Sequence, residues 1–223
     1  EDFMQERIFD PLGMMGSNTN VKALKGQQNL STPHASVAGK VQPIARRDIG
    51  NDASGSIHSN VADLAQWIRL LLASGVFQSQ QLVNPATVRE MHSPQIVIPL
   101  DSPDVAPMLA MGLGSNFFSY GLGWVVIDYQ GKKMVFHPGG IDGYAAMVAM
   151  IPGENLGLAI LTNTHESAAG ALLYALMFTI ADRCLGRPQQ DWSTDILKAV
   201  QHAEEQAEAG WQKTVNARSE GTS

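Results

Sequence analysis

Four apolar segments separated by short runs of turn-forming residues dominate the second half of this 223-residue chain. The segments span 121–129, 133–137, 144–151 and 156–162, and the intervals between them are short and rich in glycine. Strands joined this closely double back on themselves, whereas a parallel crossover needs a dozen or more residues. The pattern therefore predicts an antiparallel sheet built from hairpins.

Three stretches with helical features surround these strands. Asn60 to Ser74 starts with a good N-cap residue, and Gly75 supplies a stop. Pro85 to Met91 follows the cap residue Asn84 and predicts a second, short helix. Residues 167–185 predict a helix lying across the sheet, and no transmembrane segment, because their longest apolar run, Ala168 to Ala181, is only about fourteen residues and too short to span a bilayer.

The remaining segments suggest where the domain ends. Residues 16–56 and 93–119 are rich in turn-forming residues and predict long loops. We expect 1–190 to be the C-terminal portion of one domain, and 191–223 to be an amphipathic helix followed by a linker, Asn216 to Ser223, leading to a further domain. The apolar face expected on that helix is formed by Ile196, Val200, Ala203, Ala207 and Trp211.

Composition excludes several classes of function. A net charge of −6 and a pI near 5.4 argue against nucleic-acid binding, because phosphate contacts need clustered Lys and Arg. The single cysteine, Cys184, excludes an internal disulfide and a multi-cysteine metal site. Six histidines without ligand spacing support no metal site, and nothing in the sequence predicts a cofactor.

The segment around His137 is the best candidate for chemistry. A strand that ends in His137 and continues into Pro138, Gly139 and Gly140 places an ionisable side chain beside bare backbone. A glycine N–H there can point at developing negative charge. A glycine-rich hairpin turn with a bystander histidine explains the same residues, and both interpretations stay open at this point.

Five motifs follow one another along the chain: IFDPLGM at 8–14, ASGSIHSNVADL at 53–64, YGLGW at 120–124, HPGG at 137–140 and LGLAILTN at 156–163. Each is short, but their order is informative. Together they resemble the serine β-lactamase-related family, which includes class C β-lactamases, D-alanyl-D-alanine carboxypeptidases and related esterases.

The resemblance implies an α+β fold of the β-lactamase/transpeptidase type, an α/β-type sandwich with an antiparallel sheet flanked by helices. It implies a serine hydrolase that acts on ester or amide bonds, β-lactam or peptide-like, through an acyl-enzyme. His137 and Gly140 would be catalytic, with the Gly140 N–H as an oxyanion donor. Pro138, Gly139 and Ile141 would contact a small-molecule or peptide substrate. A periplasmic or extracellular location is typical of the family.

Two departures from the family pattern qualify this expectation. The family's Ser-x-x-Lys and Tyr-x-Asn motifs, which precede the segment matching residue 1, do not occur here. The resemblance therefore implies a domain incomplete at its N-terminus, whose missing half is a partner and without which this chain is inactive. Pro138 also lacks the hydroxyl and N–H that could contact a substrate. A non-catalytic sensor that binds cell-wall peptide or β-lactam, and a purely structural half-domain, remain alternatives.

Overall fold

The computed structural model describes residues 1–37, 39–46, 54–102, 105, 108–109, 113–164 and 167–220. Within them, six antiparallel strands form one sheet in the order β10-β9-β8-β7-β6-β5. This confirms the antiparallel prediction. The strands are β5 (Ile96–Ile98), β6 (Phe118–Tyr120), β7 (Val125–Tyr129), β8 (Lys132–Ile141), β9 (Tyr144–Ile151) and β10 (Leu156–Thr162).

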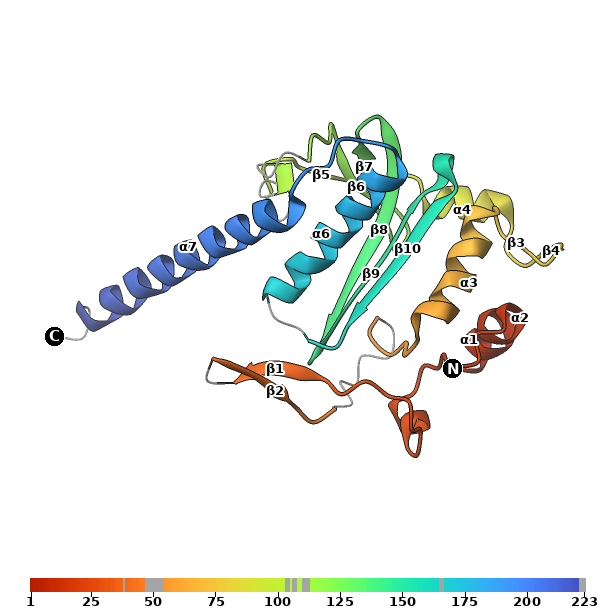
Figure 1. Cartoon of the computed structure of the whole chain (residues 1–223), viewed down its shortest axis with the longest axis horizontal. Coiled ribbons are helices and arrows are strands. Elements are labelled where there is room, and N and C mark those ends of the chain that lie inside the picture. Colours follow the sequence, from red (N-terminus) through yellow and green to blue (C-terminus); the bar gives the residue numbers. More distant parts are fainter. Residues whose placement is uncertain are drawn as a thin grey trace.

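Helices cover both faces of this sheet, which gives the expected sandwich (Figure 1). α6 (Ser167–Cys184) packs on β9 and β10 over one face. α3 (Val61–Leu72) packs on the other face, beside α4 (Pro85–Met91). Side chains alternate between the two layers along β8, so Met134 and Phe136 join the α6 core while Val135 joins the α3 core.

The predicted helix starts are confirmed in detail. The Asn60 side chain accepts hydrogen bonds from the N–H groups of Ala62 and Asp63, and the Asn84 side chain accepts one from Ala86. The Asp63 carboxylate, in the first turn of α3, makes a long-range contact. It is buried and accepts from the Gly16 N–H at 2.9 Å and the Ser17 hydroxyl at 2.8 Å, so it fastens the N-terminal segment to α3.

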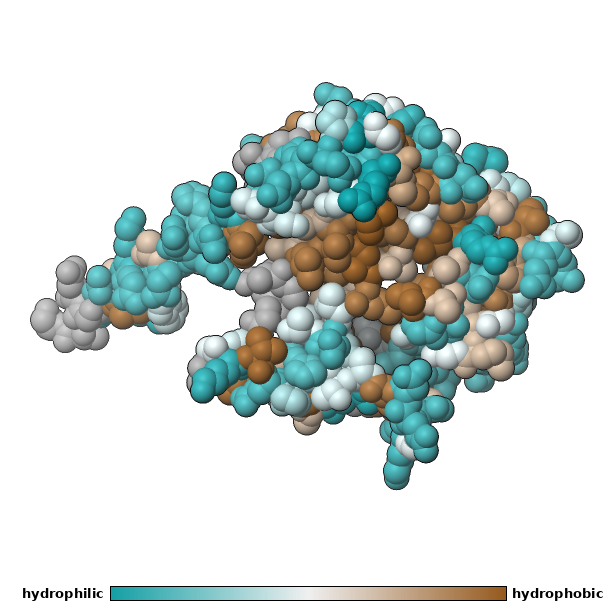
Figure 2. Space-filling view, viewed as in Figure 1, coloured by the Kyte–Doolittle hydropathy of each residue, from teal (hydrophilic) through white to brown (hydrophobic). Residues whose placement is uncertain are grey.

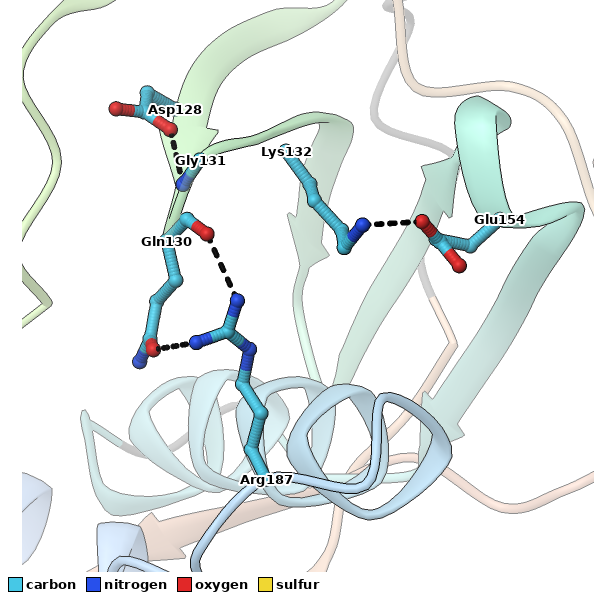
Figure 3. A network of polar contacts seen from close by, with 6 residues as sticks. All are labelled: Asp128, Gln130, Gly131, Lys132, Glu154 and Arg187. Carbon is cyan, nitrogen blue, oxygen red and sulfur yellow. Dashed lines mark hydrogen bonds and ion pairs between the residues drawn. The ribbon is translucent and has the colours of Figure 1, made fainter.

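The turn between β7 and β8 is held from outside the sheet (Figure 3). Gln130 and Gly131 both have positive φ, 53° and 84°, which is typical of a type I′ hairpin turn. The Arg187 guanidinium donates to the Gln130 side chain at 2.5 Å and to its backbone carbonyl at 2.8 Å. Lys132 forms an ion pair with Glu154 in η3 (Pro152–Glu154) of the neighbouring hairpin.

The last helix, α7 (Trp192–Glu220), starts in the core and then leaves it (Figure 1). Trp192 and Ile196 are buried against α6. The Asp182 carboxylate accepts from Trp192 Nε1 at 2.7 Å and from the Tyr129 hydroxyl at 2.6 Å. Residues 216–220, expected to be linker, continue the helix, and 221–223 lie outside the described residues.

Several regions expected to be irregular contain regular structure. The expected loop 16–56 contains η2 (Val21–Leu24) and a hairpin formed by β1 (His34–Val37) and β2 (Lys40–Pro43). The expected loop 93–119 contributes β5 and most of β6 to the sheet. The N-terminus is a short helix with α1 (Asp2–Met4), a π-helical turn (Gln5–Phe9) and α2 (Asp10–Leu12), and a small hairpin joins β3 (Val76–Phe77) to β4 (Gln80–Gln81).

Two strand boundaries were predicted wrongly. The segment 121–129 is not one strand, because residues 121–124 form the turn between β6 and β7, closed by the Gly121 N–H on the Trp124 carbonyl at 2.7 Å. The strand expected at 133–137 runs on to Ile141. Gly139 and Gly140 are therefore strand residues, paired with Ala146 and Ala145, and only Asp142 and Gly143 form the turn.

Candidate active site

β8 is longer than the strand on one side of it, and this difference opens the sheet. The last residue pair between β7 and β8 is Val125 with Phe136. On its other side, β8 stays paired with β9 as far as Ile141 and Tyr144. Residues 137–141 therefore have a partner strand on one side, and no β7 residue faces them on the other.

The hairpin register fixes where the backbone groups of this segment point. In a two-residue type I′ hairpin the residues flanking the turn exchange hydrogen bonds, and the direction of the N–H and C=O groups then alternates along each strand. Tyr129 and Lys132 flank the β7–β8 turn, so even-numbered β8 residues point toward β7. Beyond Phe136, Pro138 and Gly140 point to the open side.

The predicted site residues therefore divide into two groups. Gly140 directs its N–H and carbonyl toward the open side, and Pro138 has only a carbonyl to offer there. Gly139 and Ile141 direct their backbone groups toward β9, where they pair with Ala146 and Tyr144. An oxyanion could accept a hydrogen bond from Gly140, whereas Gly139 and Ile141 could contact a ligand only through their exposed surface.

His137 is exposed and has two polar contacts. Its Nε2 lies 2.9 Å from the Tyr120 hydroxyl, and its Nδ1 lies 2.6 Å from the Pro138 carbonyl oxygen. The Tyr120 and His137 rings meet edge to face, with centroids 5.9 Å apart. Tyr120 belongs to one of the sequence motifs, but nothing in its spacing indicated that it would contact the histidine.

A second polar cluster closes the turn end of the β8–β9 hairpin. The Tyr144 hydroxyl donates to the Ser31 carbonyl at 2.6 Å. Arg46 Nη2 donates to the same carbonyl at 2.7 Å and to the Tyr144 hydroxyl at 2.9 Å. A Cβ added to Gly143 would lie 2.4 Å from Pro33, so this glycine, with φ of 78°, is needed for the close approach. No local pattern in the sequence predicts this long-range contact.

One cavity in the described part of the chain lies away from His137. It has a volume of about 470 Å³ and lies between α3 and β10, lined by Val61, Ile68, Arg69, Leu72, Gly157 and Leu158 among others. The segment 137–141 is instead an open surface, and α6 does not seal it, because His137, Gly139 and Gly140 are exposed. A single strand edge forms only one wall of a cleft, so residues 137–141 alone cannot enclose a cavity.

His92 is a buried titratable residue that the sequence did not single out. It caps the end of α4, is 4% exposed, and packs edge to face on Trp124. Burial, helped by the positive charge of Lys133, lowers the pKa of His92 from 6.5 to about 4. Its Nε2 has no hydrogen-bond partner among the described residues, so we assign it a packing role. Those residues also contain no cluster of His, Cys, Asp or Glu that could hold a metal ion.

Comparison with known proteins identifies the family. The Beta-lactamase family model matches residues 1–181, which contain the whole six-stranded sheet, α3 and most of α6. The chain belongs to the β-lactamase family. This membership confirms the resemblance found in the sequence and relates the chain to serine hydrolases. α7 lies outside the matched region.

Relatives of this β-lactamase-family chain include enzymes and structures of known fold. The Unguisins hydrolase ungD of Aspergillus violaceofuscus is 29% identical over 84% of the chain and 34% of its own length. The octameric penicillin-binding protein homologue from Pyrococcus abyssi superposes with a TM-score of 0.65 at 20% identity, over 84% of this chain and 38% of that one. A class C β-lactamase superposes with a TM-score of 0.57 at 15% identity, over 85% and 52%.

The chain thus spans about a third of the length of this curated relative. The two structural matches show the fold. None of the helices that the structure describes combines the length and apolar character that crossing a membrane requires.

Proposed function

We propose that this chain supplies one wall of the acyl-transfer cleft of a serine hydrolase that acts on amide or ester bonds, including β-lactam or peptide-like substrates. The observation that carries the proposal is the open edge of β8, where the Gly140 N–H points away from β9 and faces no β7 residue. Membership of the β-lactamase family supports it, as does a relative named a hydrolase.

The Gly140 N–H would be one of two oxyanion donors. When a nucleophile attacks a carbonyl, negative charge develops on the oxygen, and a fixed N–H stabilises that charge without reorganising. Glycine suits this position because it adds no side chain between the backbone and the substrate. Removing one such donor typically lowers kcat by about 100- to 1,000-fold.

His137 and the residues after it would position the substrate. The imidazole stands at the start of the open edge, one strand position before Pro138. Since Pro138 has no N–H, a substrate strand lying along this edge would find its backbone donor at Gly140. Gly139 would allow close approach, because it places no side chain between the strand and the substrate. Ile141 would contribute apolar contact at the far end.

The nucleophile would come from sequence outside these 223 residues, since they contain neither Ser-x-x-Lys nor Tyr-x-Asn. The same additional segment would cover an unpaired part of the sheet. β10 is an edge strand with a half-buried apolar sequence, and the cavity against α3 lies beside it. On the opposite face Leu172, Leu176 and Ile180 form an exposed stripe along α6 (Figure 2). A strand and a helix added at this edge would bury both surfaces.

The test compares this chain with a longer polypeptide that carries a Ser-x-x-Lys motif upstream of it. Each would be incubated with a fluorescent penicillin and assayed with nitrocefin, p-nitrophenyl esters and peptide amides. We expect covalent labelling and turnover of the longer polypeptide only, both abolished when that serine is replaced by alanine. A longer polypeptide with an intact motif that neither labels nor turns over any substrate would contradict the proposal and favour a non-catalytic binding module.

A further inference from the structure

We propose that Tyr120 is a positioning residue that holds the neutral His137 ring with Nδ1 protonated and Nε2 as a hydrogen-bond acceptor. Two contacts carry this inference: Nε2 lies 2.9 Å from the Tyr120 hydroxyl and Nδ1 lies 2.6 Å from the Pro138 carbonyl. The orientation of the ring follows from these contacts alone. Its consequence for substrate binding rests on the proposed function.

The tautomer follows from which atoms can donate. A carbonyl oxygen only accepts hydrogen bonds, so Nδ1 must carry the hydrogen that is shared with Pro138. A neutral imidazole has one donor and one acceptor, which leaves Nε2 unprotonated. The Tyr120 hydroxyl is then the donor in the second bond. The opposite tautomer would set two lone pairs against each other at 2.6 Å.

The backbone of Tyr120 is held firmly enough to fix a neighbour. Tyr120 pairs with Ile96 on one side and Val125 on the other, and Val125 pairs in turn with Phe136. Tyr120 thus lies in line, across β7, with Phe136, the residue before His137. Its hydroxyl reaches the His137 ring beside the first residue of β7. The backbone on either side is also anchored, because the Tyr120 carbonyl accepts from the Gln95 N–H at 2.8 Å and the Leu122 N–H donates to the Met91 carbonyl at 3.0 Å.

This arrangement changes what the open edge offers to a substrate. Both nitrogens of the neutral ring are occupied, and the Pro138 carbonyl, which points to the open side, is already bonded. The polar atom of this pair that stays accessible to a substrate is the phenolic oxygen of Tyr120, whose remaining lone pair accepts. A group that donates, such as a substrate amide N–H, therefore fits this position better than a carboxylate.

The tautomer can be read directly by NMR on this chain labelled with ¹⁵N-histidine. The chain has six histidines, and a His137→Gln variant identifies the wanted resonances. At alkaline pH, where histidine rings are neutral, we expect a protonated Nδ1 and a hydrogen-bonded, unprotonated Nε2. Tyr120→Phe should move the Nε2 resonance downfield as the bond is lost. Tyr144→Phe, which removes a hydroxyl that bonds to Ser31, is the matched control and should leave it unchanged. A protonated Nε2, or an Nε2 resonance unaffected by Tyr120→Phe, would overturn the inference.

A double-mutant cycle in the longer polypeptide provides a second, independent readout. Loss of one hydrogen bond predicts that Tyr120→Phe lowers kcat/KM by about 3- to 10-fold. If Tyr120 acts through the histidine, the same substitution made in a His137→Gln background should change kcat/KM by less than about 2-fold. Effects that multiply would show that the two residues act separately and would contradict the positioning role. Absence of turnover in the wild type would count against the proposed function, while the NMR result would still decide the tautomer.

Discussion

Val125 and Phe136 form the last residue pair between β7 and β8, and the sheet opens immediately beyond them. β8 continues past this pair with His137 and Gly140, while β9 still covers its other side. Because backbone direction alternates along a strand, this one register decides which peptide groups face solvent. The two strands thus leave Gly140 with its polar groups on the open side.

The stability of the domain should fall as pH falls from 6.5 to 4. His92 has a pKa lowered to about 4 in the folded state, against 6.5 when unfolded, so the unfolded chain binds more protons across this window. Lowering the His92 pKa from 6.5 to about 4 corresponds to up to ~3 kcal/mol of unfolding free energy, present above pH 6.5 and lost on acidification. Urea unfolding monitored between pH 4 and 8 measures it.

The substitution that tests this assignment is His92→Leu, which keeps an apolar contact with Trp124 and removes the titrating group. It should flatten the pH dependence in that window. His202→Leu, on the exposed part of α7, is the control and should leave the wild-type profile intact. An unchanged profile in His92→Leu would assign the pH dependence to other groups.

Trp192→Phe should destabilise the domain by about 1–3 kcal/mol. The substitution removes the N–H that Asp182 accepts, leaving one oxygen of a buried carboxylate without a partner. Burial and the bond to the same carboxylate raise the pKa of Tyr129 far above its usual range, so its hydroxyl remains a donor and cannot take over. Thermal unfolding should show a Tm lower by about 2–4 °C per kcal/mol. Trp211→Phe, at a site 57% exposed, is the control and should change stability by less than about 0.5 kcal/mol. Equal losses of stability in the Trp192 and Trp211 variants would show that the hydrogen bond from Trp192 to Asp182 does not stabilise the fold.

The isolated chain should self-associate through the stripe on α6 and the edge of β10. Apolar side chains on an unprotected edge strand and a neighbouring helix favour pairing with another chain. Combining Leu161→Lys with Leu176→Lys should lower the mass found by light scattering at the same protein concentration, with little change in Tm. Leu197→Lys, at a somewhat more exposed site on α7, is the control. A monomeric wild-type chain would show that these surfaces do not associate.

Local chemistry explains which elements the sequence could predict. Capping residues such as Asn60 and Asn84 act on backbone N–H groups two or three positions away, so both helices start where expected. The hairpins of β7 to β10 were predictable for the same reason, since their turns are short. β5 and the β1–β2 hairpin were not predicted, because whether these segments form strands depends on the strands they pair with more than on their own residues.

The sequence predicted which residues form the candidate site but not how they are arranged. Glycine pairs are typical of turns, so Gly139 and Gly140 looked like part of the turn, yet they are held in β8 by pairing with Ala146 and Ala145. The contact between Tyr120 and His137 depends on how far β7 extends, which no local pattern encodes. The end of α7 was misjudged because the polar residues 216–220 still have adequate helix propensity.

The most direct test of the proposed cleft is Gly140→Pro in the longer polypeptide, compared with Gly140→Ala. Proline removes the N–H that points to the open side, whereas alanine keeps it and adds only a methyl group. We expect kcat to fall by about 100- to 1,000-fold in the proline variant and by far less in the alanine variant, at unchanged Tm. Equal activity of the two variants would show that the Gly140 N–H takes no part in the reaction and that the open edge of β8 is not a wall of the acyl-transfer cleft.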